Sequence, residues 1–548
     1  MTALRLLLWC LAGGALAQIV LWRAAGGNPH GFSLSFLHLL SAFDTHGNAL
    51  LGAIAVLAFL LRGRPAVAGA IRFAAERPWA IAGALFPALC AGSLAVYHDH
   101  ALAMDEYAPL FQSQAFAAGR LSGRLPPELL DRLVPTFFQP YFFGVARETG
   151  EISSRYWPGF ALLLAPFSWL GIPWAANPAI GALTIPALHR LAELATGSRE
   201  AAGWAVALAL ASPAFIVNAI SYYSMPAHLL CNVLFALLLL RPTPRRALLA
   251  GLIGSLALTL HQPAPHLLFS LAFFAWLLWR RSFAALGALA LGYVPLVLLL
   301  GVGWHAHIQE LSRTAQGTAA ATGAAASSVA DSLATTVRAA LSLPRWTVVE
   351  ARIAGLSKAW TWGAAGLLVL AAWGFCRARA RTEVRLLGAA LAITFFGYFL
   401  AASDQGHGWG FRYLHSAWFV LPVLAAIPMT NTENREVKTM TAWGIVLSLV
   451  LANGLRLAQV EGFVGRHLAQ VPPLARAAPA HPELVFVNIH RGFYTQDLIQ
   501  NDPFLRRSRL VLVSNGSEGD AAFAAQRFTG YRKSAEGAWG SAWRAPAR

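Results

Sequence analysis

Charged residues are scarce in this 548-residue chain, since Asp, Glu, Lys and Arg together make up only 12% of it. A soluble protein carries about 25% charged residues. Hydrophobic residues instead make up 57%, and many apolar runs approach the roughly 20 residues that cross a bilayer as a helix. The composition therefore excludes an ordinary soluble protein and predicts a chain that crosses a membrane several times.

Acidic residues are scarcer than basic ones, at 25 against 42, which gives a formal net charge of +17. Such a charge would suit a nucleic-acid-binding protein. The Arg residues, however, cluster at the ends of apolar runs, where positive charge sets the orientation of a membrane protein. We therefore expect no nucleic-acid partner.

Cysteine is also rare. The four cysteines lie within or at the ends of apolar runs, at Cys10, Cys90, Cys231 and Cys376. Their number and spacing exclude a disulfide framework and a zinc-binding pattern. We expect them to be buried free thiols.

The apolar runs predict about thirteen transmembrane helices. We place them near residues 4–22, 46–62, 78–97, 174–192, 201–218, 225–240, 246–261, 265–279, 284–301, 359–376, 385–401, 413–429 and 441–456. The N-terminus resembles a signal sequence but has no clear cleavage site, so we expect it to remain as an anchor.

Every second loop between these runs is short and basic. Because short basic loops stay in the cytoplasm, this alternation predicts a cytoplasmic N-terminus. The Asp105–Glu106 region, residues 304–358, residues 404–412 and the C-terminal tail would then face the other side. The expected location is the inner membrane of a bacterium, with the C-terminal domain in the periplasm or outside the cell.

The expected fold class is an all-α polytopic membrane protein with interfacial helices and a small external α/β domain. We divide it into two N-terminal helices (1–77), a membrane core (78–457) with external segments 98–173 and 304–358, and a soluble C-terminal domain (458–548). The apolar stretch 160–174 is too short and too rich in Pro and Gly for a span, and we expect interfacial helices there. Residues 484–489 and 509–513 are expected to be buried strands.

The most informative stretch is 104–121, which begins Met-Asp-Glu-Tyr and ends Gly-Arg-Leu. Asp105 and Glu106 form a pair of carboxylates directly after an apolar run. Such a pair at a membrane surface suits chemistry at the boundary between lipid and water. The same two residues also suit a solvated first turn of a helix.

Further motifs follow on the same expected side. They are Ser154-Arg-Tyr-Trp-Pro-Gly-Phe, Tyr222-Tyr-Ser-Met-Pro-Ala-His, His261-Gln-Pro and Gly410-Phe-Arg-Tyr. In order and spacing, the set resembles the GT-C superfamily of membrane glycosyltransferases. The nearest branch is the bacterial one related to protein O-mannosyltransferases and lipid A aminoarabinose transferase, and the resemblance covers roughly residues 78–430.

The resemblance implies transfer of a sugar from a polyprenyl-phosphate donor on the extracytoplasmic side, with inversion. The acceptor is a lipid, a glycan or a protein. Asp105 matches the position of the catalytic base, and Glu106 is the alternate or orients the acceptor. A carboxylate can accept the proton of the acceptor hydroxyl, and the leaving phosphate requires cationic donors but no acid.

Arg155, beside Tyr156, matches a basic position that contacts the donor phosphate in relatives, and Arg412 with Tyr413 is a second candidate for the phosphate. The guanidinium fork binds phosphate through two hydrogen bonds. Either Arg could instead extend to the membrane interface without a ligand.

His228 and His261 are weaker candidates for donor binding, because a lone His at the end of a span more often only packs. His261 stands where many relatives have Arg, and residues 222–228 lack the Asp that some relatives carry. We expect no cofactor; a divalent metal is left open but not favoured, with Asp404 and His407 as further candidates. His305 and His307 could form a metal pair, which we disfavour.

A transporter or flippase for a lipid-linked glycan is one alternative. It would need paired ionisable residues near mid-membrane and usually repeats, and the sequence shows neither, because its polar residues lie at the ends of the spans. A non-catalytic scaffold that binds a lipid-linked glycan is the other.

Overall fold

The computed structural model describes residues 1–25, 40–65, 68–314, 343–401, 405, 408–472 and 482–546. The chain divides into two compact units. Unit 1 comprises Met1–Ser93, Asn177–Leu298 and Ala330–Val460. Unit 2 comprises Leu94–Ala176, Leu299–Val329 and Glu461–Arg548. Each unit thus draws on separated stretches, unlike the three consecutive domains expected from the sequence.

Unit 1 is helical. Its first half contains α1 (Ala3–Ala25), α3 (Ser41–Leu60), α4 (Ala68–Glu76), most of α5 (Pro78–Ala95), α10 (Ala176–Thr196), α11 (Arg199–Leu210), α12 (Pro213–Ala219), α13 (Met225–Leu239), α14 (Pro244–Thr259), α15 (Ala264–Trp279) and α16 (Phe283–Leu296). Its second half contains α19 (Trp346–Thr361), α20 (Leu367–Ala378), α21 (Thr382–Gly397), the turn η5 (Tyr398–Leu400), α22 (Arg412–His415), α23 (Val420–Asn431), α24 (Arg435–Leu447), the π-turn η6 (Ser448–Ala452) and the start of α25 (Asn453–Leu468).

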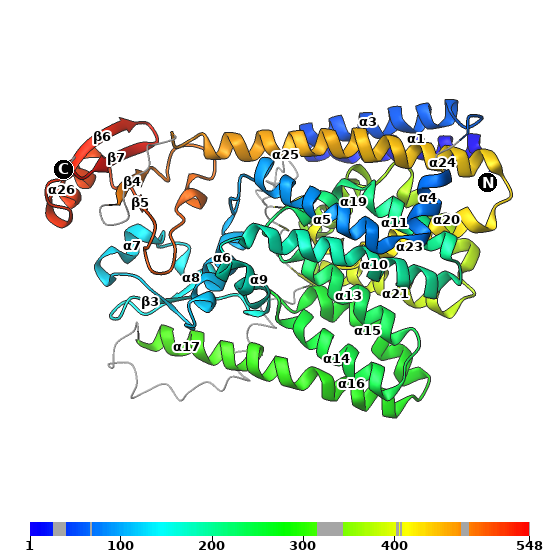
Figure 1. The fold of residues 1–548 in the computed structure, drawn as a ribbon, viewed down its shortest axis with the longest axis horizontal. Helices are drawn as coiled ribbons and strands as arrows, with labels where there is room; N and C mark the ends of the chain where they lie inside the picture. Colours follow the sequence, from blue (N-terminus) through cyan, green and yellow to red (C-terminus); the bar gives the residue numbers. More distant parts are fainter. Residues whose placement is uncertain are drawn as a thin grey trace. The chain divides into compact units, whose positions relative to one another are not determined.

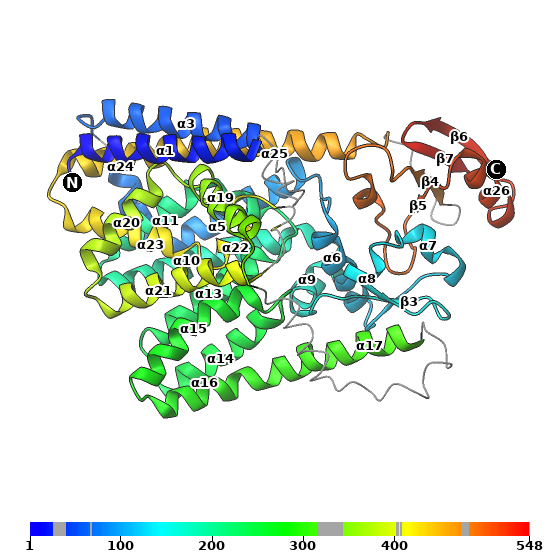
Figure 2. The same cartoon turned by 180° about the vertical axis from the view of Figure 1, so that it is seen from behind.

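Two helix groups in unit 1 can be followed in both ribbon views. Helices α1, α3 and α24 lie side by side, and α14, α15 and α16 form another group (Figures 1 and 2). In the second group Gly251 on α14 faces Gly292 on α16, and a Cβ on either would collide with the other helix. Small residues at such a crossing allow the close helix approach that is common in membranes.

The described residues contain six helices long and apolar enough to cross a membrane, or up to seven if the bent pair α11–α12 is one span. All thirteen expected positions overlap a helix, but several of these helices have only 10–17 residues. The count of thirteen therefore stays a prediction. The expected span at 359–376 is wrong at its start, because α19 continues to Thr361 and the chain turns at Gly366 before α20 begins.

The four cysteines are free, as expected, but they are not all buried. Cys10 and Cys231 are buried, Cys90 is half-buried and Cys376 is exposed. Cys376 lies near the end of α20, on a face that the unit does not cover. The expectation of burial is therefore wrong for Cys376.

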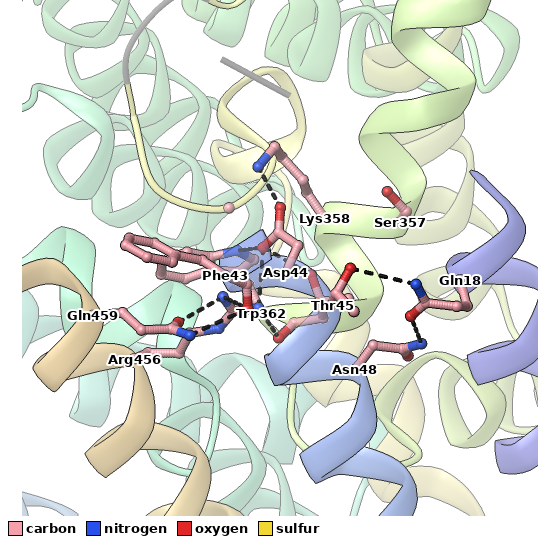
Figure 3. A network of polar contacts seen from close by, with 12 residues as sticks. Gln18, Phe43, Asp44, Thr45, Asn48, Ser357, Lys358, Trp362, Arg456 and Gln459 are labelled. Atoms are coloured by element: carbon pink, nitrogen blue, oxygen red, sulfur yellow. Dashed lines mark hydrogen bonds and ion pairs between the residues drawn. The ribbon is translucent and has the colours of Figure 1, made fainter. Parts of the chain in front are cut away.

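A cluster of buried charges joins α3 to α19 and α25 (Figure 3). The carboxylate of Asp44 lies 2.6 Å from Lys358 Nζ and 3.0 Å from an Arg456 guanidinium nitrogen, and all three side chains are at most 1% exposed. Trp362 Nε1 also donates to Asp44 at 2.7 Å. Buried charges are tolerated only when paired in this way.

The three charges of the Asp44 cluster lie on helices far apart in sequence, and a single sequence does not reveal which distant charges meet. Asp44 lies in the first turn of α3 and Lys358 in the last turn of α19. The expectation that no ionisable pair lies near mid-membrane stays a prediction.

Unit 2 contains a small sheet and short helices around α6 (Met104–Ala117). Strands β1 (Gly123–Arg124), β2 (Phe143–Val145) and β3 (Glu151–Ser154) pair antiparallel in the order β1-β3-β2. The helices are η1 (Pro127–Leu129), α7 (Leu130–Leu133), α8 (Gln139–Phe142), α9 (Gly159–Trp169), η2 (Pro173–Ala175), the π-turn η3 (Val297–Gly303), which begins in unit 1, and α17 (Trp304–Thr314).

The C-terminal part of unit 2 has the expected α/β composition. Its four-stranded sheet has the order β5-β4-β7-β6, formed by β4 (Glu483–Val487), β5 (Arg509–Val513), β6 (Arg532–Gly537) and β7 (Gly540–Arg544), with η7 (Thr495–Leu498) and α26 (Ser517–Arg527). The first two strands pair in parallel. Strands β4 and β5 lie where the apolar runs of the sequence predicted them, because a strand with little solvent-exposed surface consists of consecutive apolar residues.

Candidate active site

The two adjacent carboxylates lie in the first turn of α6, in different surroundings. Glu106 is fully buried, and its carboxylate accepts a hydrogen bond from the backbone N–H of Leu102 at 2.7 Å. Asp105 is only partly buried. The side chains of consecutive helix residues point about 100° apart, so Asp105 and Glu106 face different surroundings. Glu106 therefore fastens the chain before α6, and Asp105 is the carboxylate that remains accessible.

Asp105 has a tyrosine partner, Tyr156, from the motif that begins at Ser154. The hydroxyl of Tyr156 donates a hydrogen bond to Asp105 Oδ1. Tyr156 is the second residue after β3, and its ring packs edge-on against Phe142 with the centroids 6.0 Å apart. The structure thus brings together two of the predicted site residues that are 51 positions apart.

Gln112 holds these two segments in register. Its side-chain oxygen accepts from the backbone N–H of Ser154 at 3.0 Å, and its amide donates to the Leu121 carbonyl at 2.7 Å. Gln112 is fully buried on α6. Trp304 Nε1 donates to the Ser154 carbonyl at 3.1 Å. Gln112 on α6 therefore holds the end of β3, from which the chain continues to Arg155 and Tyr156.

Arg155 lies beside Tyr156 and is exposed. Its Nε donates to the Phe143 carbonyl at 3.2 Å, and its backbone N–H donates to Phe142. These bonds anchor the base of the guanidinium to β2. The arrangement suits a cation held in place for an anionic ligand.

Asp497 is a third carboxyl group at this site, and the sequence analysis missed it. It lies on η7, is 5% exposed, and accepts a hydrogen bond from the backbone N–H of Met104 at 3.2 Å. Burial raises the pKa of Asp497 to about 7, and the charge of Asp105 adds to this rise. A second carboxyl group beside the accessible one is typical of sites that handle protons.

Other bonds join the Asp497 segment to α6. The backbone N–H of Asn501 donates to the Tyr107 hydroxyl at 2.8 Å, and that hydroxyl donates to the Asn501 carbonyl. Gln500 Nε2 donates to the Ala101 carbonyl at 2.6 Å. The C-terminal part of the chain therefore forms one wall around the start of α6. This contact could not be predicted from the sequence, because the stretch 494–504 carries no motif.

Unit 1 holds a second group of predicted residues, around α22. The Arg412 guanidinium lies over the ring of Tyr223, 4.7 Å from its centroid, and donates to the Gln405 carbonyl at 2.8 Å. Tyr413 stacks on Tyr398 with the centroids 4.2 Å apart. The buried Arg352 lies 4.5 Å from the Tyr413 ring. Arg352 is a cation that the sequence analysis did not select.

His228 is buried on α13, in the neighbourhood of His261, His266 and His415. His261 lies between α14 and α15, where the sequence places the end of the expected span 246–261. His266 has the packing role in this group, since its ring nitrogens each lie 2.6 Å from a polar atom, Asn232 Oδ1 and the Tyr293 hydroxyl.

Asp404 and His407 lie outside the described residues. Within the described part of the chain, no group of three or more His, Cys, Asp or Glu side chains could hold a metal ion. His307 Nε2 lies 3.2 Å from the hydroxyls of both Ser122 and Ser153, and His305 Nε2 contacts Gln309. Both histidines of the suggested pair thus have polar protein partners.

Comparison with known proteins identifies the fold. No family model and no curated protein matches the sequence. Two solved structures of ArnT from Cupriavidus metallidurans match the structure. ArnT bound to undecaprenyl phosphate is 12% identical with a TM-score of 0.54, covering 86% of this chain and 100% of ArnT. The apo structure is 12% identical with a TM-score of 0.53, covering 86% and 99%. The chain therefore has the fold of ArnT, a GT-C membrane glycosyltransferase.

Proposed function

We propose that this protein is an integral-membrane glycosyltransferase. It transfers a sugar from a polyprenyl-phosphate-linked donor to a hydroxyl of a lipid, glycan or protein acceptor. The observation that carries the proposal is the accessible Asp105 carboxylate, bonded to Tyr156 beside the exposed Arg155. The likeness in fold to ArnT bound to undecaprenyl phosphate supports the choice of donor.

Asp105 is the general base in this proposal. As the acceptor oxygen bonds to the anomeric carbon, its proton passes to the Asp105 carboxylate. The bond from the anomeric carbon to the phosphate oxygen breaks, and its electron pair stays on the phosphate. Base and leaving group lie on opposite faces of the sugar, so the configuration inverts. The Tyr156 hydroxyl orients the carboxylate and favours its ionised form.

Arg155 binds the leaving phosphate, whose negative charge grows during this step. Its Nε bond to Phe143 holds it in place, so little side-chain entropy is lost when it binds the phosphate. The donor-binding roles of Arg412, Tyr413, His228 and His261, which lie in unit 1, stay predictions from the sequence. Asp497 positions the first turn of α6, and its raised pKa lets it hold a proton beside Asp105 at pH values below about 7.

The alternating charge of the loops supports a cytoplasmic N-terminus. In this orientation the proposed site is extracytoplasmic, at the outer surface of a bacterial inner membrane. The reaction requires no metal or other cofactor in this proposal.

Sugar release from synthetic polyprenyl-phosphate sugars by the purified protein tests the proposal. Asp105→Asn should lower turnover at least a hundredfold while donor binding remains, and Arg155→Ala should weaken donor binding. Glu106→Gln is the matched control, since an amide oxygen can still accept from Leu102. Unchanged turnover in Asp105→Asn would exclude this residue as the base. Binding without turnover in the wild type would indicate the scaffold.

Transport of a lipid-linked glycan is the second candidate, and the buried Asp44 cluster is the observation that favours it. Buried charges within apolar helices are typical of transporters. In proteoliposomes, a transporter would move a labelled polyprenyl-phosphate sugar between leaflets without releasing the sugar. Movement that is lost in Asp44→Asn, with no transfer product, would replace the transferase proposal.

A further inference from the structure

A cavity of about 910 Å³ opens in unit 1, away from the residues proposed for sugar transfer. It lies between α4, the start of α11 and the start of α24. Its volume falls in the range of small-molecule sites, roughly 300–1,000 Å³. The charged residues around it are Arg62, Arg64, Arg72, Arg199, Arg435 and Lys438, together with Glu76, Glu200 and Glu436.

The three carboxylates of the cavity are each paired with a cation. Arg62 lies 3.6 Å from Glu436, Arg72 lies 3.8 Å from Glu76, and Lys438 lies 3.5 Å from Glu200. The remaining cations are Arg64, Arg199 and Arg435, for which the described residues offer no acidic partner within 4 Å. The cavity therefore carries a net charge of +3 that protein carboxylates do not neutralise.

The floor of this cavity is apolar and closely packed. It contains the buried side chains of Ile71, Ala75, Trp204 and Ala442. Helices α4 and α11 approach closely because position 203 is glycine; a Cβ there would lie 2.6 Å from the Ile71 carbonyl oxygen. One cation of the charged rim is also held in place, since Arg199 Nε donates a hydrogen bond to the Ala75 carbonyl at 3.2 Å. A basic rim over an apolar floor matches an anionic amphiphile.

All three chain segments of the cavity belong to the short basic loops that the sequence predicts to be cytoplasmic. The cytoplasmic leaflet carries negatively charged phospholipids, and basic pockets between helix ends on that side bind anionic headgroups. We infer that this cavity binds a phosphate-bearing anionic group, supplied by the headgroup of a membrane phospholipid. The inference does not depend on the proposed glycosyl transfer.

The test compares full-length variants in bilayer discs of phosphatidylcholine, with and without phosphatidylglycerol. One triple variant carries Arg64→Gln, Arg199→Gln and Arg435→Gln. A matched control removes the same charge from other basic helix ends, through Arg245→Gln, Arg379→Gln and Arg385→Gln. Retained lipid is counted by native mass spectrometry, and unfolding in phosphatidylcholine alone checks that each variant folds.

We expect the wild type and the control to retain phosphatidylglycerol and the cavity variant to retain at least tenfold less. Inorganic pyrophosphate, added to phosphatidylcholine discs, distinguishes the source. If pyrophosphate binds with the same dependence on the three Arg residues and phosphatidylglycerol does not, the phosphate chemistry holds but the ligand is soluble. Equal retention of both probes by the cavity and control variants would overturn the inference.

Discussion

Asp497 accepts a hydrogen bond from the backbone N–H of Met104, the residue directly before Asp105, although 393 positions separate the two. Ala103, the cap residue of α6, supplies no side-chain bond of its own, so a carboxyl group from the C-terminal part of the chain takes that role. An acceptor at a helix N-terminus typically contributes about 1 kcal/mol. The C-terminal part of unit 2 therefore helps to hold the proposed base.

The raised pKa of Asp497 predicts a pH dependence of stability. The ordinary value is 3.8 and burial raises it to about 7, so the folded protein holds this proton more tightly than the unfolded chain does. The contribution is fully present below about pH 4 and is lost as the pH rises towards 7. Asp497→Asn should therefore flatten the fall in unfolding midpoint between pH 4 and 7, measured by thermal unfolding in detergent. A fall as steep as in the wild type would contradict this assignment.

Replacement of Tyr156 by Phe should change the pH profile of sugar transfer. Without the hydroxyl, the Asp105 carboxylate loses a hydrogen bond that favours its charged form. Such a bond contributes about 1.5–3 kcal/mol, so the acid limb of the rate profile should move upward by about one pH unit or more. The exposed Tyr141 provides the control, since Tyr141→Phe should leave the limb in place. The same shift in both variants would argue against a specific role of Tyr156.

Gln112→Ala should destabilise unit 2, because it leaves the buried Ser154 N–H without its acceptor and removes the hydrogen bond to the Leu121 carbonyl. Each such loss costs about 1–3 kcal/mol. The midpoint of thermal unfolding reports the effect. Gln114→Ala on the same helix, where the side chain is only half-buried, should cost much less. Similar losses in the two variants would mean that the bonds of Gln112 contribute little.

Asp44→Ala should be among the most destabilising changes in unit 1. It leaves Lys358 and Arg456 buried without their shared counter-ion, which typically costs about 3–5 kcal/mol. Glu193→Ala breaks an exposed pair with Arg190 instead and should cost less than about 1 kcal/mol. Unfolding by denaturant in detergent compares the two variants. A small effect in Asp44→Ala would show that the cluster relaxes around water or another counter-ion.

Much of the fold could be predicted because its signals are local. Each expected span overlaps a helix, since a continuous apolar run decides both burial and helix formation within one stretch of chain. The first turn at Asp105 and Glu106 and the strands at 483–487 and 509–513 follow from similar short patterns. The boundary at 359–376 failed because a left-handed turn at Gly366 interrupts an unbroken apolar run.

The sequence by itself determined that this chain enters membranes, where its apolar helices and the first two C-terminal strands lie, and which motifs carry polar residues beside apolar runs. Only the tertiary structure decided that Asp105 is accessible and Glu106 buried, that Tyr156 and Asp497 join the start of α6, and that Asp44 meets two cations. The reason is physical. Apolar burial and helix formation depend on neighbouring residues, whereas these polar contacts join residues 51 to 412 positions apart and arise only when packed elements bring them within bonding distance.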